Sequence, residues 1–343
     1  MTALTASDTI KVGITGATGL VGSDLLSYLS DNTSNVKVRA IARRPEAMVG
    51  RENIEVAGAD ILDQAALQAA FAGLDIVVHA AGFVDPLADR QKIFAVNLKG
   101  TENAYQAAKA CGVKQFIHIS SLSVITGQHD QFDLDEQAPL CLCGEAYADS
   151  KVESEKYLQG LMHGGLPITI LRPGFIYGEG ERAWLKRVMQ SVLQGQAILV
   201  DGGTRATNVV YVRNLSSLIK ACLLNEATYD QIFNVTDPEL VSKKMLFDTV
   251  ADALGVPRIK KNLPRPVVKA LFEILGTIGS ISGIFNEKSK AQFARFSPGA
   301  FRLIAVNQGF SIEKARKVLG YPFADCVGFS QAMQETIGRI QAK

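Results

Sequence analysis

The feature that most constrains the fold is a glycine-rich segment near the start of the chain, GITGATGLVG. It follows an apolar, β-rich run, Ile10–Thr15, and precedes a helical segment that is expected to start at about Leu20. A glycine at such a turn adopts backbone angles that other residues avoid, and it lets a phosphate approach the main chain. The helix N-terminus then offers free N–H groups and a positive dipole to an anion. We therefore predict that Gly16, Gly19 and Gly22 form a dinucleotide-binding loop.

Short apolar runs alternate with helical segments through the first half of the chain. Further strands are expected at Lys37–Ala42, Ile54–Ala57, Ile76–His79, Gln115–Ser120 and Ile168–Arg172, and helices at Ala65–Phe71, Ile93–Cys111 and Glu145–Leu161. Strands that alternate with helices predict a parallel, doubly wound sheet. Near-continuous Val and Ile runs indicate that helices cover both faces. The predicted fold class is α/β, with a Rossmann-type sheet.

After Arg172 the pattern becomes mostly helical, with helices expected near Ala183–Leu193, Asn214–Leu224, Lys243–Leu254 and Val267–Leu275. Two short runs, Asn208–Val212 and Phe233–Val235, are predicted to be strands that return to the main sheet. We therefore predict a dinucleotide-binding domain over residues 8–178, joined by 205–236. Residues 179–204 and 237–343 are expected to form a smaller, mostly helical C-terminal lobe that binds the substrate.

The end of the second predicted strand indicates which dinucleotide is bound. In NAD-specific folds an acidic residue at this point binds the ribose hydroxyls of the adenosine. This chain has Ala42 there, followed by Arg43 and Arg44. Because an arginine can pair with a 2′-phosphate, NADP(H) is the favoured cofactor, and NAD(H) is the alternative. The simpler interpretation of Arg43 and Arg44 is that they are solvent-exposed loop residues with no role in cofactor binding. Asp60, after the third strand, can accept a hydrogen bond from the adenine amino group.

Two Tyr-x-x-x-Lys pairs place a phenol and an ammonium on one helix face, Tyr105 with Lys109 and Tyr147 with Lys151. The spacing does not distinguish between them. Tyr105 lies late in its predicted helix, whereas Tyr147 lies at the start of a helix that follows an acidic loop. Ligands of open parallel sheets bind at the carboxyl ends of the strands, so Tyr147 and Lys151 are the predicted catalytic pair.

The predicted strand before that acidic loop ends in Ser120 and Ser121, which brings a hydroxyl to the same edge of the sheet. Ketone reduction needs a hydride from a nicotinamide and a proton from an acid, and alcohol oxidation is the reverse. A tyrosine of reference pKa about 10 needs roughly 4 kcal/mol of preference for the phenolate to titrate near 7. We expect the positive charges of Lys151 and of the oxidised nicotinamide ring to supply this preference for the phenolate. Ser121 is expected to hold the substrate oxygen, and Lys151 also the nicotinamide ribose.

Seven segments, in order, carry a resemblance to a known superfamily: TGATGLVG, GADILD, VVHAAG, NLKGT, FIHISSLSV, YADSK and RPGFIYG. Over roughly residues 10–240 the chain resembles the extended branch of the short-chain dehydrogenases/reductases, the NAD-dependent epimerase/dehydratase superfamily. The resemblance implies that Ser121 is the active serine and that Asn97 positions the lysine or a proton relay. It also implies that Pro173, Gly174 and Phe175, in RPGFIYG, line the nicotinamide site. The further cofactor contacts predicted on these segments are Thr18, Leu20, Val21, Ile61, Ala80, Ala81, Gly82, Ser120, Pro173, Gly174 and Phe175.

Departures from the superfamily's patterns indicate which of its reactions this chain is expected to catalyse. Sugar 4,6-dehydratases carry an Asp-Glu pair after the active threonine, whereas this chain has Leu122-Ser123. Epimerases usually keep an acidic residue for NAD, whereas arginines stand here. The apolar stretch Phe272–Phe285, with Phe293, Phe296 and Phe301, is similar to the 3β-hydroxysteroid dehydrogenase-like group. We therefore predict an oxidoreductase that interconverts a bulky apolar ketone and a secondary alcohol. One alternative is a nucleotide-sugar epimerase. The other is a regulator that binds NADP(H) without catalysis; such proteins tend to lose the Tyr/Lys pair, which this chain retains.

Composition excludes several other partners. The formal net charge is +2 with scattered basic residues, so no nucleic-acid surface is expected. The five cysteines lack the paired spacings of a zinc site, the Cys141-x-Cys143 pair is interpreted as loop thiols, and no metal is predicted. His79 and His118 lie on predicted buried strands and are interpreted as hydrogen-bonded core residues. The absence of a signal-like segment favours a cytoplasmic location, and analogy with the family suggests a homodimer.

One segment raises the question of membrane contact. Val267–Phe285 is strongly apolar but is interrupted by Lys269 and Glu273, and its charge-free part is shorter than the ~20 residues that span a bilayer. No transmembrane segment is therefore predicted. The helical spacing of its apolar residues suits burial in the core, a lid over the substrate, or weak contact with a membrane surface. The sequence favours core or lid.

Overall fold

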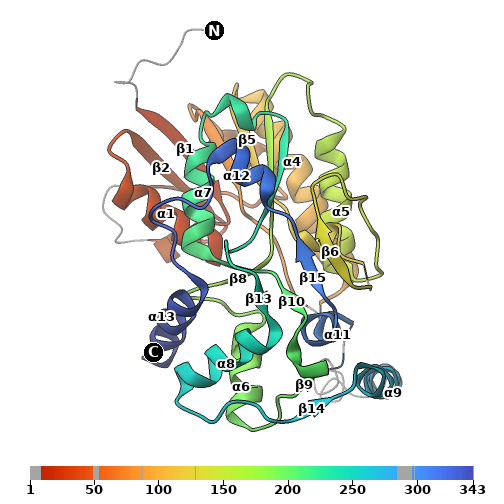
Figure 1. The fold of residues 1–343 in the computed structure, drawn as a ribbon. Coiled ribbons are helices and arrows are strands. Elements are labelled where there is room, and N and C mark those ends of the chain that lie inside the picture. Colours follow the sequence, from red (N-terminus) through yellow and green to blue (C-terminus); the bar gives the residue numbers. More distant parts are fainter. Residues whose placement is uncertain are drawn as a thin grey trace.

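A parallel sheet of seven strands forms the centre of the computed structural model, which describes residues 9–48, 54–85, 88–127, 129–283, 296 and 298–342 (Figure 1). The strand order is β12-β7-β5-β4-β1-β2-β3, and every neighbouring pair is parallel. The strands are β1 (Ile10–Thr15), β2 (Val36–Ala42), β3 (Glu55–Gly58), β4 (Ile76–His79), β5 (Gln115–Ile119), β7 (Ile168–Pro173) and β12 (Gln231–Val235). The prediction of a doubly wound parallel sheet is confirmed. The order reverses between β1 and β4, where open sheets of this kind bind ligands.

Helices cover both faces of the sheet, as the continuous Val and Ile runs predict. On one face lie α1 (Leu20–Asn32), α7 (Val212–Cys222) and α12 (Glu313–Leu319), and on the other α2 (Gln64–Phe71), α4 (Gly100–Ala110) and α5 (Ala146–Gln159). Successive residues of β4 point to opposite faces, because Ile76 and Val78 join one core cluster and Val77 the other. The region expected to be one helix from Ile93 is α3 (Arg90–Phe94), a π-helical turn (Ala95–Lys99) and α4.

A second lobe, built mainly of helices, lies beyond the carboxyl ends of the strands (Figure 1). Its helices are α6 (Leu185–Leu193), α8 (Lys243–Leu254), α9 (Arg265–Gly283), α11 (Pro298–Ala305) and α13 (Phe329–Gln341). Four short strand pairs lie outside the main sheet: β8 (Phe175–Tyr177) with β11 (Val209–Tyr211), β9 (Leu199–Val200) with β14 (Asn262–Leu263), β10 (Ala206–Thr207) with β13 (Val241–Ser242), and β6 (Gln131–Leu134) with β15 (Gln308–Phe310). Helix α12 belongs by sequence to the range 237–343 that was expected to form the lobe. In the structure it packs on β12 and α7 instead and so lies on the main sheet.

One of the two returning strands was predicted wrongly. Phe233–Val235 lies in β12, at the edge of the main sheet, as expected. The run Asn208–Val212 instead contributes β11, which pairs with β8 outside that sheet. The reason lies at Gly174, where the chain leaves β7: a Cβ there would lie 2.4 Å from the carbonyl oxygen of Asn208. The two backbones meet at this glycine, so the returning strand follows β8 away from the sheet.

No helix among the described residues is long and apolar enough to cross a membrane.

Candidate active site

The glycine-rich loop joins β1 to α1 and requires glycine at two positions. Gly16 has φ +68°, and a Cβ there would lie 2.7 Å from the backbone of Ala81, which follows β4. A Cβ on Gly22 would lie 2.3 Å from the carbonyl oxygen of Gly16. Gly19 is the N-cap residue of α1 and has no side chain to occupy the first N–H groups of the helix. The loop is therefore tight, and it leaves the helix N-terminus available to an anion.

A cavity of about 2300 Å³ runs from this loop, past the carboxyl ends of β5 and β7, into the second lobe. Many of the predicted site residues line it: Thr18, Gly19, Leu20, Val21, Ala80, Gly82, Ser120, Ser121, Tyr147, Lys151, Pro173, Gly174 and Phe175. The structure thus brings together residues from five separate segments, which were predicted from the sequence to meet at one edge of the sheet.

Ser121 and Tyr147 meet in this cavity. Ser121 follows β5, and Tyr147 lies in the first turn of α5, where its hydroxyl shares a hydrogen bond with Ser121. Burial raises the pKa of Tyr147, and the hydrogen bond with Ser121 acts in the opposite direction. In the polypeptide alone the pKa shift is therefore opposite to the one that proton transfer near neutral pH needs.

Lys151 lies one helical turn after Tyr147 and is 5% exposed. Its ammonium group donates a hydrogen bond to the carbonyl oxygen of Ile119 at 2.8 Å. Burial lowers the pKa of Lys151 to about 8, and the nearby carboxylate of Glu155 opposes that effect. A Cβ on Gly82 would lie 3.7 Å from Nζ of Lys151, so the chain after β4 passes close to this amine.

A fully buried ion pair lies behind the lysine. Arg172, at the end of β7, donates to Oε1 of Glu155 from Nε at 2.9 Å and from a terminal nitrogen at 2.5 Å. Ser120 donates to Oε2 of the same carboxylate at 2.5 Å. The Ser120 hydroxyl, which was predicted to contact the cofactor, therefore donates its hydrogen bond to a side chain of the protein itself. One carboxylate therefore connects the segments that carry Ser121, Lys151 and Pro173.

Asn97 contacts the neighbour of Lys151 rather than the lysine itself. It lies in the π-helical turn, is buried, and donates to Oγ of Ser150 at 2.9 Å. The same side chain accepts from the backbone N–H of Phe83 at 2.8 Å and donates to the Phe83 carbonyl oxygen at 3.1 Å. Asn97 therefore ties the segment after β4 to helix α5.

The predicted adenosine contacts lie at the ends of β2 and β3. Arg43 and Arg44 are exposed directly after β2. Asp60 accepts a hydrogen bond from the backbone N–H of Leu62 at 2.9 Å. Ile61 is buried, and a Cβ on Gly100 would lie 2.5 Å from its side chain, so Ile61 packs under α4 rather than facing the cavity.

The other Tyr/Lys pair lies away from this site. Tyr105 is buried against Phe116, with ring centroids 5.6 Å apart, whereas Lys109 is exposed. His79 is buried and contacts the hydroxyls of Thr15 and Thr101, and burial lowers its pKa to about 3, as expected for a core histidine. His118 is buried as predicted, but neither ring nitrogen has a hydrogen-bond partner within the described part of the chain.

The part of the cavity inside the second lobe has an apolar wall. It is formed by Phe175, Trp184, Leu271, Phe272, Phe296, Leu303, Ile304 and Phe310. Polar residues of the same lobe, Arg182, Arg187, Ser191 and Gln196, line another part of the cavity. Of the aromatic residues predicted to face a substrate, Phe272 and Phe296 line the cavity and stack edge to face at 5.4 Å. Phe301 packs on Phe272 from behind, whereas Phe285 and Phe293 lie outside the described residues.

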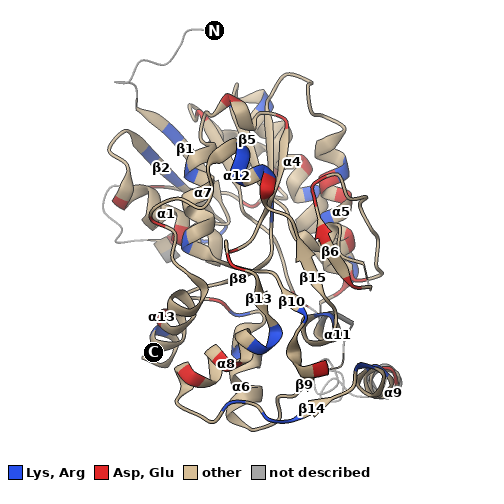
Figure 2. Cartoon of the chain, in the orientation of Figure 1, with Lys and Arg blue, Asp and Glu red and all other residues tan. Residues whose placement is uncertain are grey.

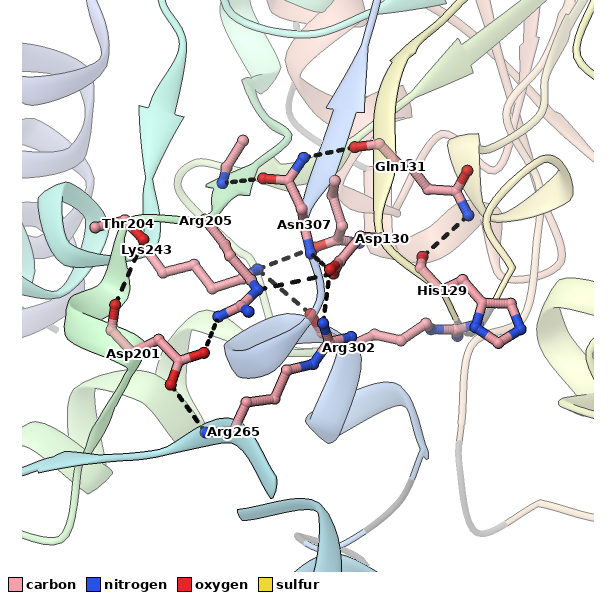
Figure 3. A network of polar contacts seen from close by, with 12 residues as sticks. His129, Asp130, Gln131, Asp201, Thr204, Arg205, Lys243, Arg265, Arg302 and Asn307 are labelled. Atoms are coloured by element: carbon pink, nitrogen blue, oxygen red, sulfur yellow. Dashed lines mark hydrogen bonds and ion pairs between the residues drawn. The ribbon is translucent and has the colours of Figure 1, made fainter. Parts of the chain in front are cut away.

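A polar network that was not predicted fixes this lobe to the edge of the sheet domain that carries Ser121 and Tyr147 (Figure 3). Asp130 accepts from the backbone N–H of Asn307 at 2.8 Å and from Arg265 at 2.6 Å, and these contacts lower its pKa. The buried ammonium of Lys243 donates to the carbonyl oxygen of Leu303 at 2.7 Å. Arg302, beside it on α11, donates to Glu145, two residues before Tyr147. The described residues contain no group of His, Cys, Asp and Glu side chains that could hold a metal ion.

Comparison with known proteins identifies the family. Residues 13–264 match the model of the 3-beta hydroxysteroid dehydrogenase/isomerase family. The chain belongs to this family. The prediction of an extended short-chain dehydrogenase/reductase of the 3β-hydroxysteroid dehydrogenase-like group, and with it of an NAD(P)-dependent oxidoreductase acting on CH–OH groups, is thereby confirmed.

This member of the 3β-hydroxysteroid dehydrogenase family is similar to one curated relative in sequence and to two solved structures in fold. It is 29% identical to a 3 beta-hydroxysteroid dehydrogenase/Delta 5-->4-isomerase of Mycobacterium tuberculosis, across 91% of this chain and 85% of that protein. The gox2253 crystal structure superposes with a TM-score of 0.78 at 21% identity, covering 98% of each chain. A UDP-glucuronic acid 4-epimerase from Bacillus cereus, solved with NAD, superposes with a TM-score of 0.72 at 20% identity, covering 97% of this chain and 99% of that one.

Proposed function

We propose that this protein interconverts a bulky, apolar ketone and the corresponding secondary alcohol, with NADP(H) as the favoured cofactor. The observation that carries the proposal is the meeting of the Ser121 and Tyr147 hydroxyls, above the buried Lys151, in a cavity whose far wall is apolar. Polar groups that converge at one end of an apolar pocket are typical of sites that orient a hydrophobic small molecule.

The residues present fit a dinucleotide. The uncapped N-terminus of α1 and the backbone around Thr18, Gly19 and Leu20 offer N–H donors to the pyrophosphate. Pro173, Gly174 and Phe175 line the cavity where the nicotinamide would lie beside Tyr147. A bound nicotinamide dinucleotide supplies a hydride to the carbonyl carbon, or accepts one from the alcohol carbon.

The choice between the two dinucleotides rests on Arg43 and Arg44. Both are exposed after β2, at the position from which a guanidinium can pair with a 2′-phosphate, and no acidic side chain stands at Ala42 to favour the free ribose. NAD(H) is the alternative, since the structural relative from Bacillus cereus was solved with NAD.

The chain's own residues then handle the proton. In reduction the Tyr147 hydroxyl donates its proton to the substrate oxygen, while the Ser121 hydroxyl holds that oxygen by a hydrogen bond. In oxidation Tyr147 accepts the proton as a phenolate. The ammonium of Lys151, held by Ile119, provides the positive charge that favours the phenolate against the effect of burial. Asn97 keeps α5 and the chain after β4 in register around this group.

A substrate panel tests the proposal against the two alternatives. Reduced-nicotinamide absorbance is followed with steroid and other bulky apolar ketones and alcohols, and thermal shifts are measured with the same compounds and with nucleotide sugars. Turnover of apolar ketones or alcohols is expected. Stabilisation by a nucleotide sugar alone would favour an epimerase, and NADPH binding without turnover of any compound would favour a sensing protein.

A further inference from the structure

One side of helix α6 faces the cavity inside the second lobe. Four residues at helical spacing line the cavity, namely Trp184, Arg187, Val188 and Ser191. Trp184 fixes the start of this row, because its ring contacts that of Phe175 at 5.8 Å and its indole N–H donates to the carbonyl oxygen of the next residue, at 2.9 Å. With a rise of about 1.5 Å per residue, Arg187 and Ser191 lie about 4.5 and about 10.5 Å further along the axis than Trp184.

Arg187 has no ion-pair partner in the part of the chain that the structure describes, and neither has Arg182, which also lines the cavity. The two acidic residues nearest to Arg187 in the sequence make other contacts. Glu179 pairs with Arg339 of α13 at 3.0 Å. Glu181 is buried and accepts from three backbone N–H groups at the start of α6. Both guanidinium groups are exposed to the cavity and are therefore available to a ligand.

Two neutral polar side chains extend the same wall. Ser191 lies one turn after Arg187, and its backbone carbonyl accepts from the N–H groups of Gln196 at 2.9 Å and Ala197 at 3.1 Å. The chain after α6 therefore turns back beside Ser191, and Gln196 lines the cavity there. A hydroxyl and a carboxamide can both donate to an oxygen that a guanidinium binds.

The positive charge of this wall is a local feature. Basic and acidic residues are interspersed over both lobes (Figure 2), and the whole chain carries a formal net charge of only +2. A guanidinium pairs with a carboxylate, phosphate or sulfate group through two parallel hydrogen bonds. The rest of the cavity inside the lobe is apolar, and the few polar groups of an apolar pocket orient its ligand. The wall therefore fits a molecule with an apolar body and an anionic end.

We propose that Arg187, together with Ser191 and Gln196, binds an oxyanion at one end of an otherwise apolar substrate. This inference rests on the proposed function and narrows it. The carbonyl or alcohol carbon lies at Tyr147, while a carboxylate, phosphate or sulfate group of the same molecule lies against α6. Arg182 adds a second positive charge to the same cavity. Arg187 thereby selects anionic substrates over neutral ones of similar size and fixes which end of the molecule reaches the phenol.

Fluorescence of the single tryptophan tests the proposal, because Trp184 lies in the cavity-facing row of α6. The full chain is titrated with decanoate, decyl phosphate and uncharged 1-decanol, which share one apolar chain. At least one of the two anions is expected to bind about tenfold more tightly than 1-decanol, and the difference should shrink at high salt. The two anions distinguish a carboxylate from a phosphate as the preferred group.

Arg187→Gln should reduce the preference for the anion to about twofold or less. Lys186→Gln is the matched control, because Lys186 is exposed on the same helix but does not line the cavity, and it should keep the preference of the wild type. NADPH affinity should be unchanged in both variants.

Three results would overturn the proposal: equal binding of the anions and 1-decanol, no binding of either anion, or an undiminished preference in Arg187→Gln. A loss of NADPH affinity in that variant, with the anion preference intact, would assign the guanidinium to the cofactor instead. Since the titration needs no turnover, a failure to find any reaction would remove the proposed function and leave the measured preference for anions standing.

Discussion

Ser120 donates a hydrogen bond of 2.5 Å to Glu155, a carboxylate that is fully buried in the sheet domain. The same carboxylate is paired with Arg172, which is 1% exposed. Each partner immediately precedes a residue of the candidate site, Ser121 or Pro173, and Glu155 itself lies one helical turn after Lys151. The geometry of the site therefore depends on a charge that does not face the cavity.

Replacing Glu155 by Gln should destabilise the protein by about 3–5 kcal/mol, because Arg172 would be left as an uncompensated buried charge. Urea unfolding followed by circular dichroism measures this. The exposed pair of Lys156 and Glu153 on the same helix, at 2.9 Å, provides the control: Glu153→Gln should change stability by less than about 1 kcal/mol. Equal effects of the two substitutions would refute the structural role of the buried pair.

Replacing Tyr147 by Phe should lower turnover by about 10²–10⁴-fold, since the substrate oxygen loses its proton donor. NADPH affinity should stay within a few-fold, because the phenol is proposed to act on the substrate rather than on the dinucleotide. Steady-state kinetics and fluorescence titration with NADPH measure the two effects. Tyr105→Phe is the matched control and should be nearly silent; a loss of turnover in that variant would move the site to the other Tyr/Lys pair.

Replacing Arg43 and Arg44 together by Ala should weaken NADPH binding by about tenfold or more and leave NADH binding nearly unchanged. The reason is that only NADPH carries the 2′-phosphate. Isothermal titration with both dinucleotides measures the ratio of affinities. Lys37→Ala, at an exposed position on β2, is the control for a general loss of positive charge. A parallel loss of both affinities would argue against NADP(H) preference.

The contribution of Lys243 to the free energy of unfolding should rise with pH between about 7 and 10. Burial lowers the pKa of Lys243 to about 7, whereas an unfolded lysine keeps its proton up to about 10.4. Between these values the unfolded chain binds more protons than the folded one, so stability increases with pH, by up to about 1.4 kcal/mol per unit for this group. Lys151 contributes in the same direction above about 8.

Urea unfolding at several pH values in this range checks that dependence. Lys243→Met removes the titrating group together with its hydrogen bonds to the Arg302 and Leu303 carbonyl oxygens, so it should lower stability at every pH and flatten the slope. A slope that is identical in the variant and the wild type would show that this lysine keeps its ordinary pKa in the folded protein.

The sequence predicted the parts of the site that depend on local pattern. The turn at Gly16, the helix start at Leu20 and the positions of Ser121 and Tyr147 follow from short segments, since strand ends of a parallel sheet meet at one edge. The contacts of Asp130 were not predictable in this way. Asn307 lies 177 residues away and Arg265 135 residues away, and neither belongs to a recognisable motif. The pairing of β11 was missed because its apolar character fits either partner, and only the close approach of Gly174 and Asn208 decides it.

The ion pair between Arg302 and Glu145 has an evolutionary consequence. Arg302 is followed by Leu303 and Ile304 of the apolar wall, and Glu145 precedes Tyr147 by two residues. A mutation that reshapes α11 to accommodate a new molecule also disturbs the start of the helix that presents the phenol. The two halves of this protein are therefore not interchangeable modules: a lobe grafted from a relative would need to bring a residue at position 302 that pairs with Glu145, or the graft would disturb the start of the helix that carries Tyr147, the proposed proton donor.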